Sequence, residues 1–588
     1  MWVYFDFASE RSLGRTRIRQ KLRIRSVAAY EAPRQDYAKI EDQKEARKRP
    51  ERRSTRLFCA GYHWAASLAM SIILLALAVL VWGVVSLICP LYRNWTTARQ
   101  LHVRLIICPI PKDGILWQLA RLLLQRYPLH SLWKYLPVLR MIRPNWIFLE
   151  QHAIYQDFGE VFAFVTPTRC EVFVANVDIA TQILSRRHDF PKPIEMLQKL
   201  NLFGKSLASV EGADWNHHRR CTAAAFSDKV NETVWTQSYH EASRTLEQFL
   251  SRDVVSQTRS EMIRISFAVL LNACMGIGDN DETDAIEKRS FDLDAAKIDL
   301  TTLLRIISRS PALRFSLPFG RKGPNAFTAA RVGFQSFLMK LITYRRDQPP
   351  GHKDLLSSMI RYQDENMLSD EELQGNMFLF MFAGHETTAN TLIYIIHLLA
   401  VFPNWQSWAM EEIDEVIGGR AVDRIPSSQE TFPRLRRLRA IVYETLRLYG
   451  PVVMVPRQTS PHQPQKVTRP DGSELVIPPN IRINIVPAAW HTSQEYWGAD
   501  ASSWNPSRWI CQDTSSSPVP PESNHEILDR GKIDNLLAWA MGPRSCPGKR
   551  FSQLEIMAVL VALLQHAAVQ VSPVQGTVCK RPGGKLLG

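Results

Sequence analysis

The sequence lacks the paired cysteines that mark a disulfide framework or a zinc site. Its cysteines are an odd number, nine, and no two of them form a C-x-x-C pair. They are Cys59, Cys89, Cys108, Cys170, Cys221, Cys274, Cys511, Cys546 and Cys579. We therefore expect a reducing compartment, and each cysteine is expected to be a buried, unreactive thiol unless its neighbours argue otherwise.

A nucleic-acid-binding pattern is also lacking, although the formal net charge is +15. Residues 1–69 hold 16 Lys and Arg against 8 Asp and Glu, a net 16 − 8 = +8, which leaves 15 − 8 = +7 for the remaining 519 residues. Because this excess lies in a tail without interleaved aromatic residues, nucleic acid is not an expected partner. The 45% hydrophobic and 22% charged residues are typical of an ordered chain with a large core.

Charged residues are absent from residues 71–92, which contain no Asp, Glu, Lys, Arg or His. Twenty-two helical residues extend about 33 Å, enough to cross a bilayer core of about 30 Å. A buried core helix is rarely so evenly apolar, and the apolar core of a cleaved signal peptide is shorter. The segment therefore predicts a single membrane-spanning anchor.

The orientation of this anchor depends on where translation begins. The basic residues before it would keep the N-terminus in the cytosol and send the large domain across the membrane, which conflicts with a reducing compartment. A start at Met70 would leave Arg93, Arg99 and Arg104 after the anchor and hold the large domain in the cytosol. The expected divisions are a basic extension at 1–69, mispredicted or dispensable, an anchor at 71–92, a linker at 93–114 and a catalytic domain at 115–588.

The large domain is expected to be mainly α with small β-sheets. Apolar residues recur at helical spacing in residues 239–250, 328–345 and 370–399. Short strand patterns occupy residues 161–164, 171–174, 474–477 and 481–485, with a Pro-Asp-Gly hairpin turn at 470–472. Residues 513–522 read as a surface loop.

Cys546 lies in the stretch W-A-M-G-P-R-S-C-P-G, between Gly542 and Gly548. The glycines permit tight turns beside a bulky flat group, and Arg544 offers a fixed charge for an anion. The stretch resembles the F-x-x-G-x-R-x-C-x-G signature of the cytochromes P450, with Trp539 in place of phenylalanine. The resemblance implies a cytochrome P450 fold in which Cys546 is the thiolate ligand of haem b iron and Arg544 contacts a haem propionate.

Residues 381–390, M-F-A-G-H-E-T-T-A-N, place polar side chains inside an apolar helix, where each needs a partner or a wet cavity. Gly384 would leave room for a flat ligand, and the Thr387 hydroxyl would bond the preceding turn. The stretch resembles the family's [AG]-G-x-[DE]-T-[TS] motif. The resemblance implies that Glu386 and Thr387 are an acid–alcohol pair that delivers protons during oxygen activation.

Two further patterns match the family. Glu444 and Arg447 stand three apart in Y-E-T-L-R-L, and Arg508 follows in W-N-P-S-R-W. They resemble the E-x-x-R and P-x-R elements, which implies a buried structural triad. Trp215 and Arg219 resemble the W-x-x-x-R element, which implies contacts to the haem propionates.

Arg457, in V-P-R-Q-T, is a further propionate candidate, the alternative being a solvated arginine at a strand end. His217 and His218 are expected to be exposed helix residues, not iron ligands. The pocket is expected to be apolar. Its candidate lining residues are Met377, Phe378, Met381, Phe382 and residues 452–455, about half of which are expected to belong to the core instead.

The resemblance implies a monooxygenase that inserts one oxygen atom of O₂ into a lipophilic small molecule such as a terpenoid, polyketide or alkaloid. Local stretches such as R-R-C-T-A-A-A-F-S are similar to microsomal enzymes of filamentous fungi, which implies a single-pass endoplasmic reticulum protein with its catalytic domain in the cytosol. No flavin or nicotinamide fingerprint precedes Cys546, so electrons are expected from an NADPH-cytochrome P450 reductase, with cytochrome b5 as a second partner. Docking candidates are Lys549, Arg550, Lys580 and Arg581.

Other functions stay open at this point. The enzyme class allows a fatty-acid or xenobiotic hydroxylase. A redox-independent isomerase or dehydratase on the same fold is disfavoured by the intact Glu386 and Thr387, since such enzymes commonly lack this pair. A non-enzymatic alternative is a membrane-tethered haem-binding or sterol-binding protein.

Overall fold

The structure is a computed structural model that describes most of the chain but not all of it. The described residues are 51–112, 114–126, 136–223, 226–251, 257–277, 293–307, 324–349, 354–418, 425–512, 526–571 and 577–580. The loop expected at 513–522 and Arg581 lie outside them, as do residues 1–50 of the basic extension. The chain divides into two units, one ending at Cys89 and one starting at Pro90.

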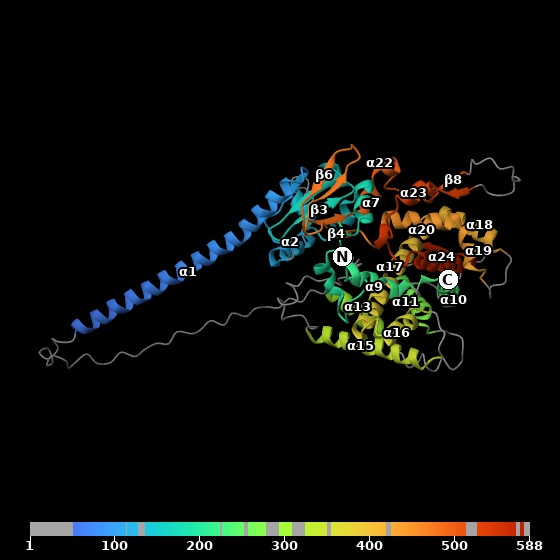
Figure 1. The fold of residues 1–588 in the computed structure, drawn as a ribbon, viewed down its shortest axis with the longest axis horizontal. Helices are drawn as coiled ribbons and strands as arrows, with labels where there is room; N and C mark the ends of the chain where they lie inside the picture. The colour runs from blue at the N-terminus through green and yellow to red at the C-terminus, as the bar shows by residue number, and fades with distance from the viewer. Residues whose placement is uncertain are drawn as a thin grey trace, which may run out of the picture. The chain divides into compact units, whose positions relative to one another are not determined.

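Long helices form the body of the second unit. The long α17 (Asp370–Val401) packs against α11 (Thr258–Met275), and α10 (Asp228–Leu250) packs against α24 (Lys549–His566). Figure 1 shows α17, α24 and α20 (Arg436–Tyr449) gathered in the middle of this body. The helical periodicity predicted around residues 239–250 and 370–399 is confirmed.

The start of α17 follows from its sequence. Ser369 and Glu372 form a capping box, in which each side chain bonds the other's backbone N–H. Three acidic residues stand in the first turn, where negative charge is favourable, and most of the apolar residues that follow are buried. This helix therefore runs through the core with its first turn fixed.

The largest sheet has five strands in the order β1-β2-β3-β7-β4. Its strands are β1 (Arg104–Ile107), β2 (Val161–Val165), β3 (Cys170–Val174), β7 (Arg482–Ile485) and β4 (Val455–Gln458). The β1–β2 and β3–β7 pairs are parallel, while β2–β3 and β4–β7 are antiparallel. This sheet carries β4, and with it Arg457, to the functional site.

The predicted hairpin is confirmed. β5 (Gln465–Thr468) pairs antiparallel with β6 (Glu474–Ile477) across the turn at Gly472, whose φ of 81° suits glycine. The strand predicted at 481–485 is also found, as β7 of the large sheet.

The remaining elements complete the second unit. The other helices are α2 (Ile115–Arg126), α4 (Pro137–Ile142), α5 (Trp146–Glu150), α6 (Ala153–Phe158), α7 (Val177–Ser185), α8 (Ile194–Leu197), η1 (Gln198–Leu200), α9 (Gly212–Ala223), α13 (Leu293–Ile307), α15 (Pro324–Asp347), α16 (Leu355–Asp364), α18 (Pro403–Ile417), α19 (Ser428–Arg434), α21 (Pro487–Trp490), α22 (Gln494–Trp497), η3 (Pro506–Trp509), α23 (Arg530–Asp534) and η4 (Gly542–Arg544). Two more strand pairs are β8 (Ile510–Gln512) with β9 (Glu526–Leu528) and β10 (Ala568–Val571) with β11 (Thr577–Lys580). Fold class is therefore as predicted, mainly α with small sheets.

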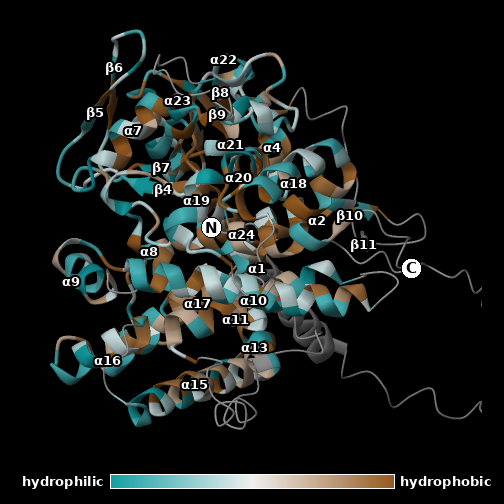
Figure 2. Cartoon of the chain, turned by 90° about the vertical axis from the view of Figure 1, so that its right-hand side faces the viewer, coloured by the Kyte–Doolittle hydropathy of each residue, from teal (hydrophilic) through white to brown (hydrophobic). Residues whose placement is uncertain are grey.

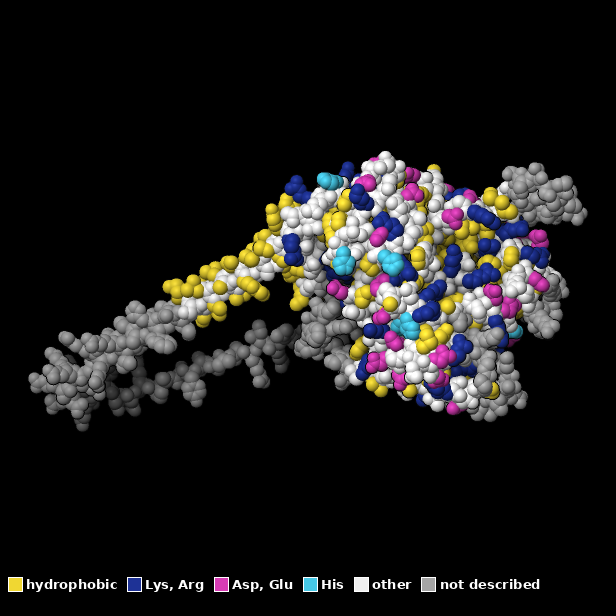
Figure 3. All heavy atoms as spheres, viewed as in Figure 1, with side chains coloured by type: hydrophobic (Ala, Val, Ile, Leu, Met, Phe, Trp, Pro, Cys, Tyr) yellow, Lys and Arg dark blue, Asp and Glu magenta, His cyan; other side chains and the backbone are white. Residues whose placement is uncertain are grey.

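The anchor segment is helical. It lies in α1 (Glu51–Arg99), within which Met70–Arg99 is long and apolar enough to cross a membrane. Figure 3 shows this stretch as hydrophobic side chains with no charged one until the helix nears its end. The helix is longer than the predicted 71–92, since helical residues continue on both sides of the apolar core.

A second apolar surface lies on α2, coloured by hydropathy in Figure 2. Its exposed hydrophobic side chains are Ile115, Leu116, Leu119, Leu122 and Leu123, spaced as one helical face. A soluble monomer rarely leaves such a row of leucines uncovered. We therefore expect another molecule to cover this face of α2.

Candidate active site

A cavity of about 400 Å³ lies between α17, the loop before α24, and the segment that leads into β4. Its walls are mostly apolar, with contributions from Leu379, Phe380, Phe382, Ala383, Pro451, Val452, Met454, Val455, Leu537, Ala538 and Phe551. Its volume falls in the range of ligand pockets in proteins, about 300–1,000 Å³. Cys546 and Thr387 both line it, although 159 positions separate them in the sequence.

The backbone before α24 holds Cys546 in a tight loop. The Cys546 N–H donates to the Trp539 carbonyl over 2.8 Å, and the Lys549 N–H donates to the Cys546 carbonyl over 3.3 Å. Gly542 adopts a φ of 71°, and a Cβ there would lie 2.5 Å from the Leu184 carbonyl oxygen. Glycine is therefore required at this position both for its dihedral angle and for the close approach of α7.

The thiol of Cys546 is exposed to the cavity while protein surrounds the loop that carries it. Burial raises the pKa of the thiol, and the Gly548 backbone N–H and the Arg219 charge oppose that shift. A metal ion bound to the sulfur would favour the thiolate against this effect of burial.

Thr387 faces the cavity from α17. Its hydroxyl donates to the Ala383 carbonyl over 2.9 Å, the bond to the preceding turn that the sequence predicts. Gly384 also lines the cavity, as does Leu270 of α11, and a Cβ at Gly384 would lie 2.9 Å from Leu270 Cδ1. The missing side chain therefore leaves space both for the packing of α11 and within the cavity.

Glu386 does not line the cavity. Its carboxylate lies 4.0 Å from the Arg259 guanidinium of α11, and its side chain is 16% exposed. Burial raises the pKa of this carboxyl and Arg259 lowers it. The two residues of the predicted acid–alcohol pair thus face different surroundings, the alcohol toward the cavity and the acid toward an arginine.

Basic residues gather on one wall of the cavity, and they include all the predicted propionate contacts. Trp215, Arg219, Arg457 and Arg544 all line it. Arg544 Cζ lies 3.9 Å from the centroid of the Trp215 ring, a cation–π contact. Arg457 is buried, which excludes the solvated strand-end alternative, and burial followed by the nearby Arg544 lowers its pKa to about 10.

Haem fits the donors of this wall. Arg544 Nη1 is buried without a hydrogen-bond partner among the described residues, although Nη2 pairs with Glu211. An unpaired buried guanidinium nitrogen calls for an anionic acceptor, and a haem propionate is one. No cluster of three or more His, Cys, Asp and Glu side chains that could hold a metal occurs in the part of the chain that the structure describes. A lone thiolate ligand such as Cys546 suits a metal whose other ligands come from a porphyrin.

Two residues of this site were missed from the sequence. Lys192 lines the basic wall, and nothing in its surroundings P-K-P distinguishes it as a ligand. Glu555 of α24 is buried, and burial raises the pKa of its carboxyl to about 8, an effect only partly offset by the hydroxyls of Ser266 and Thr388. Thr388 lines the cavity, so an uncharged acid lies directly behind the Thr387 turn.

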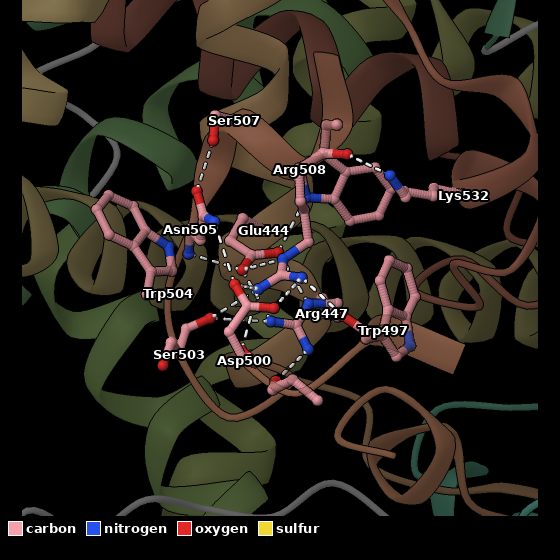
Figure 4. A network of polar contacts seen from close by, with 12 residues as sticks. Glu444, Arg447, Trp497, Asp500, Ser503, Trp504, Asn505, Ser507, Arg508 and Lys532 are labelled. Atoms are coloured by element: carbon pink, nitrogen blue, oxygen red, sulfur yellow. Dashed lines mark hydrogen bonds and ion pairs between the residues drawn. The ribbon is translucent and has the colours of Figure 1, made fainter. Parts of the chain in front are cut away.

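The predicted Glu444–Arg447–Arg508 triad comes together away from the cavity (Figure 4). Arg447 binds Glu444 through two nitrogens at 2.8 Å, and Arg508 Nε donates to Glu444 over 2.9 Å. The Trp509 indole N–H donates to the same carboxylate, and Arg447 also bonds the backbone carbonyls of Ala501 and Ser503. Every partner of this ion cluster is hydrogen-bonded, so it fastens α20 to residues 497–509.

The prediction that His217 and His218 are both exposed is wrong for His218. His218 is fully buried, and its Nδ1 lies 2.9 Å from the Asn376 amide of α17, with Glu372 3.3 Å from Nε2. His218 lies on the inner face of α9, where its polar contacts join α9 to α17. Neither histidine lines the cavity.

The predicted apolar set divides between cavity and core, as expected. Phe382, Val452, Met454 and Val455 line the cavity, whereas Met377, Phe378, Met381 and Val453 belong to the core. Of the docking candidates with described side chains, Lys549 is exposed but Arg550 lies 3.8 Å over the Phe432 ring.

Comparisons with known proteins agree with this site. The family model described as "Cytochrome P450" matches residues 127–586. A cytochrome P450 monooxygenase of Arthrobotrys oligospora is 24% identical over 84% of this chain and 91% of the relative. The phomenoic acid biosynthesis cluster cytochrome P450 monooxygenase of Leptosphaeria maculans is 25% identical over 82% of this chain and 89% of the relative.

Solved structures share the fold. A crystal structure of a cytochrome P450, CYP102L1, superposes with a TM-score of 0.56 at 19% identity and covers 72% of this chain and 89% of that chain. Cyanobacterial CYP120A1, solved with retinoic acid bound, gives a TM-score of 0.55 at 21% identity, with 72% and 88% covered. The chain therefore belongs to the cytochrome P450 family, oxidoreductases that bind haem through a cysteine thiolate.

Proposed function

We propose that this chain is a membrane-anchored monooxygenase that inserts one oxygen atom of O₂ into a lipophilic secondary metabolite, a terpenoid, polyketide or alkaloid. The observation that carries the proposal is the cavity that Cys546 and Thr387 both line. An apolar chamber lined by the Cys546 thiol, by hydroxyls of α17 and by a basic wall suits haem on one side and an uncharged substrate on the other.

Each residue has a part in this proposal. Cys546 would bind the haem iron through its thiolate, and Trp215, Arg219, Arg457 and Arg544 would hold the haem carboxylates, with Trp539 packed beside the thiolate loop. Bound haem supplies the reduction of dioxygen and the oxidation of the substrate. Thr387 donates a proton within the cavity, and Glu386 returns protons to it after releasing Arg259.

The substrate class rests on the lining of the cavity and on the relatives. The lining residues Phe380, Phe382, Val452 and Met454 offer apolar contacts and carry no charge. One relative carries the name of a phomenoic acid biosynthesis cluster. A fungal secondary metabolite without charge near the oxidised carbon is therefore the substrate that we favour.

Electron delivery and location complete the proposal. We assign electron supply to an NADPH-cytochrome P450 reductase, with cytochrome b5 as a second donor, docking near the exposed Lys549. The residues from Met70 onward anchor the chain in the endoplasmic reticulum with residues 115–588 in the cytosol. The uncovered face of α2, so soon after the apolar helix, suits contact with lipid.

Replacement of the sulfur tests the haem-thiolate centre. We expect purified wild-type protein to bind haem and to give the carbon monoxide difference spectrum of a thiolate-ligated ferrous haem. Cys546→Ser should lose that spectrum, because a hydroxyl is a poor ligand for the iron. The exposed Cys511 supplies the control, since Cys511→Ser leaves the loop untouched.

Oxygen insertion is tested separately. With reductase and NADPH present, a lipophilic substrate should stimulate oxygen uptake, and Thr387→Ala should release more of the reducing equivalents as peroxide. Turnover that needs neither reductase nor NADPH would overturn the monooxygenase proposal in favour of an isomerase or dehydratase.

A further inference from the structure

Lys192 stands in the segment between α7 and α8, and this segment is fixed from both sides. The Lys192 backbone N–H donates to Glu211 Oε1 over 2.9 Å. The Pro191 carbonyl accepts from the Gln458 N–H of β4 over 2.9 Å. Its position beside Arg457 of β4 is therefore built into the backbone.

The ammonium group of Lys192 has a donor to spare. Its Nζ donates to the carbonyls of Leu207 and Ala208 over 3.1 and 3.2 Å. An ammonium carries three N–H donors. Among the described residues the third has no hydrogen-bond partner, and the side chain lines the cavity.

The charges around this ammonium do not balance. Arg544 and Arg457 are the cations that act on it, and Glu211 is the acid that does so. Glu211 is already engaged by Arg544. With Arg219 on the same wall, four cations line the cavity beside this one carboxylate, an excess of positive charge that the two haem propionates would offset.

We propose that Lys192 is a further haem-binding residue, whose ammonium holds a propionate beside Arg457 and Arg544 and which must stay protonated for the haem to be retained. This inference rests on the haem-thiolate function proposed above. The competing role is structural, in which the lysine only ties its own segment to residues 207–208.

If Lys192 holds a propionate, haem retention should depend on pH near neutrality, whereas an arginine at this position would give no such dependence. Burial, followed by Arg544, lowers the pKa of Lys192 to about 7, and an adjacent carboxylate raises it. The contact of the charged form is then complete at low pH and is lost as pH rises above neutral. Arginine at this position would stay charged throughout.

Transfer of haem from the holoenzyme to apomyoglobin measures retention without any turnover. At pH 7, we expect Lys192→Met to lose haem about tenfold faster than wild type, as for a lost hydrogen bond to a charged group. Lys192→Arg should retain it. Between pH 7 and 9, wild type should release haem progressively faster than Lys192→Arg does, after correction for the Lys205→Met control, whose lysine is exposed and pairs only loosely with Asp214 at 4.0 Å.

The resonance Raman band of the propionate bending modes provides a direct readout of contact. It should shift in Lys192→Met and not in Lys205→Met. Unchanged haem loss and an unchanged band in Lys192→Met would overturn the proposal and leave the structural role. Failure of the wild-type protein to bind haem at all would instead overturn the function on which the inference rests.

Discussion

At the scale of single residues, the site is a set of groups whose charge states depend on burial. Cys546 and Glu555 are both shifted toward their neutral forms, while Lys192 loses affinity for its proton beside two arginines. Such opposed shifts within one region are typical of functional sites. The protonation states here are therefore open to change by a bound cofactor or substrate.

Glu555 gives a prediction for stability against pH. Burial raises the pKa of its folded-state carboxyl to about 8, above the usual value for an unfolded chain. The folded state then binds the extra proton between about pH 4.5 and pH 8, so the free energy of unfolding falls as pH rises through this window, by at most about 1.4 kcal/mol per pH unit.

Glu555→Gln should flatten that part of the profile, because its amide has no proton to lose. Urea unfolding of the holoenzyme at several pH values checks this. The exposed Glu474 serves as the control in Glu474→Gln, which should keep the wild-type slope. A wild-type profile that rises between pH 5 and pH 8 in step with Glu555→Gln would contradict the assignment.

The sequence indicated Cys546, Thr387 and the basic residues because their neighbours form dense local patterns. Lys192 was not predicted, because the position of this lysine depends on backbone carbonyls at 207–208 and on β4, which no local sequence pattern reveals. Residue types were therefore predictable, and the packing that explains them was not.

At the scale of elements, the Glu444 cluster joins α20 to the loop at 497–505 and to the short helix η3 that follows it. Arg447 and Glu444 are fully buried, and residues 501–509 supply much of their hydrogen bonding. The i, i+3 spacing predicted that the two would meet, and Arg508 followed from the family pattern. The tryptophan and backbone contacts required the structure.

Arg447→Met tests the strength of this junction. The change keeps the length of the side chain but leaves Glu444 as a buried charge with fewer partners, so we expect the free energy of unfolding to fall by about 3–5 kcal/mol. Chemical denaturation of the holoenzyme measures it. Arg346→Met, which removes an exposed pair with Asp364, should cost less than about 1 kcal/mol.

At the scale of the whole molecule, two apolar surfaces point to a membrane, the helix from Met70 onward and the face of α2. The first was evident from composition, because an uncharged run of 22 residues has few other uses. The second was not, since the α2 pattern I-L-W-Q-L-A-R-L-L-L-Q-R reads equally as a core helix. Only the structure leaves its leucines uncovered.

Fractionation separates the contributions of these surfaces. The full chain should stay in membranes after alkaline carbonate extraction. A chain that starts at Pro90 should be released by carbonate, yet should sediment with vesicles at low salt through α2. Adding Leu119→Glu and Leu122→Glu should make that shorter chain soluble, whereas the exposed Val476→Glu should not. Equal sedimentation of all the shortened chains would exclude lipid contact by α2.

Cys546 comes three residues before Lys549, the first residue of α24, and the 18 residues of that helix point their peptide dipoles toward it. A helix N-terminus carries about half a unit of positive charge, which favours a negative sulfur over a neutral one. The electron density that this sulfur can share with iron therefore depends partly on the backbone dipole of α24, whatever the side chains of that helix are. An insertion between Cys546 and Lys549 would shift the redox potential of the centre even if the ligand itself stayed bonded.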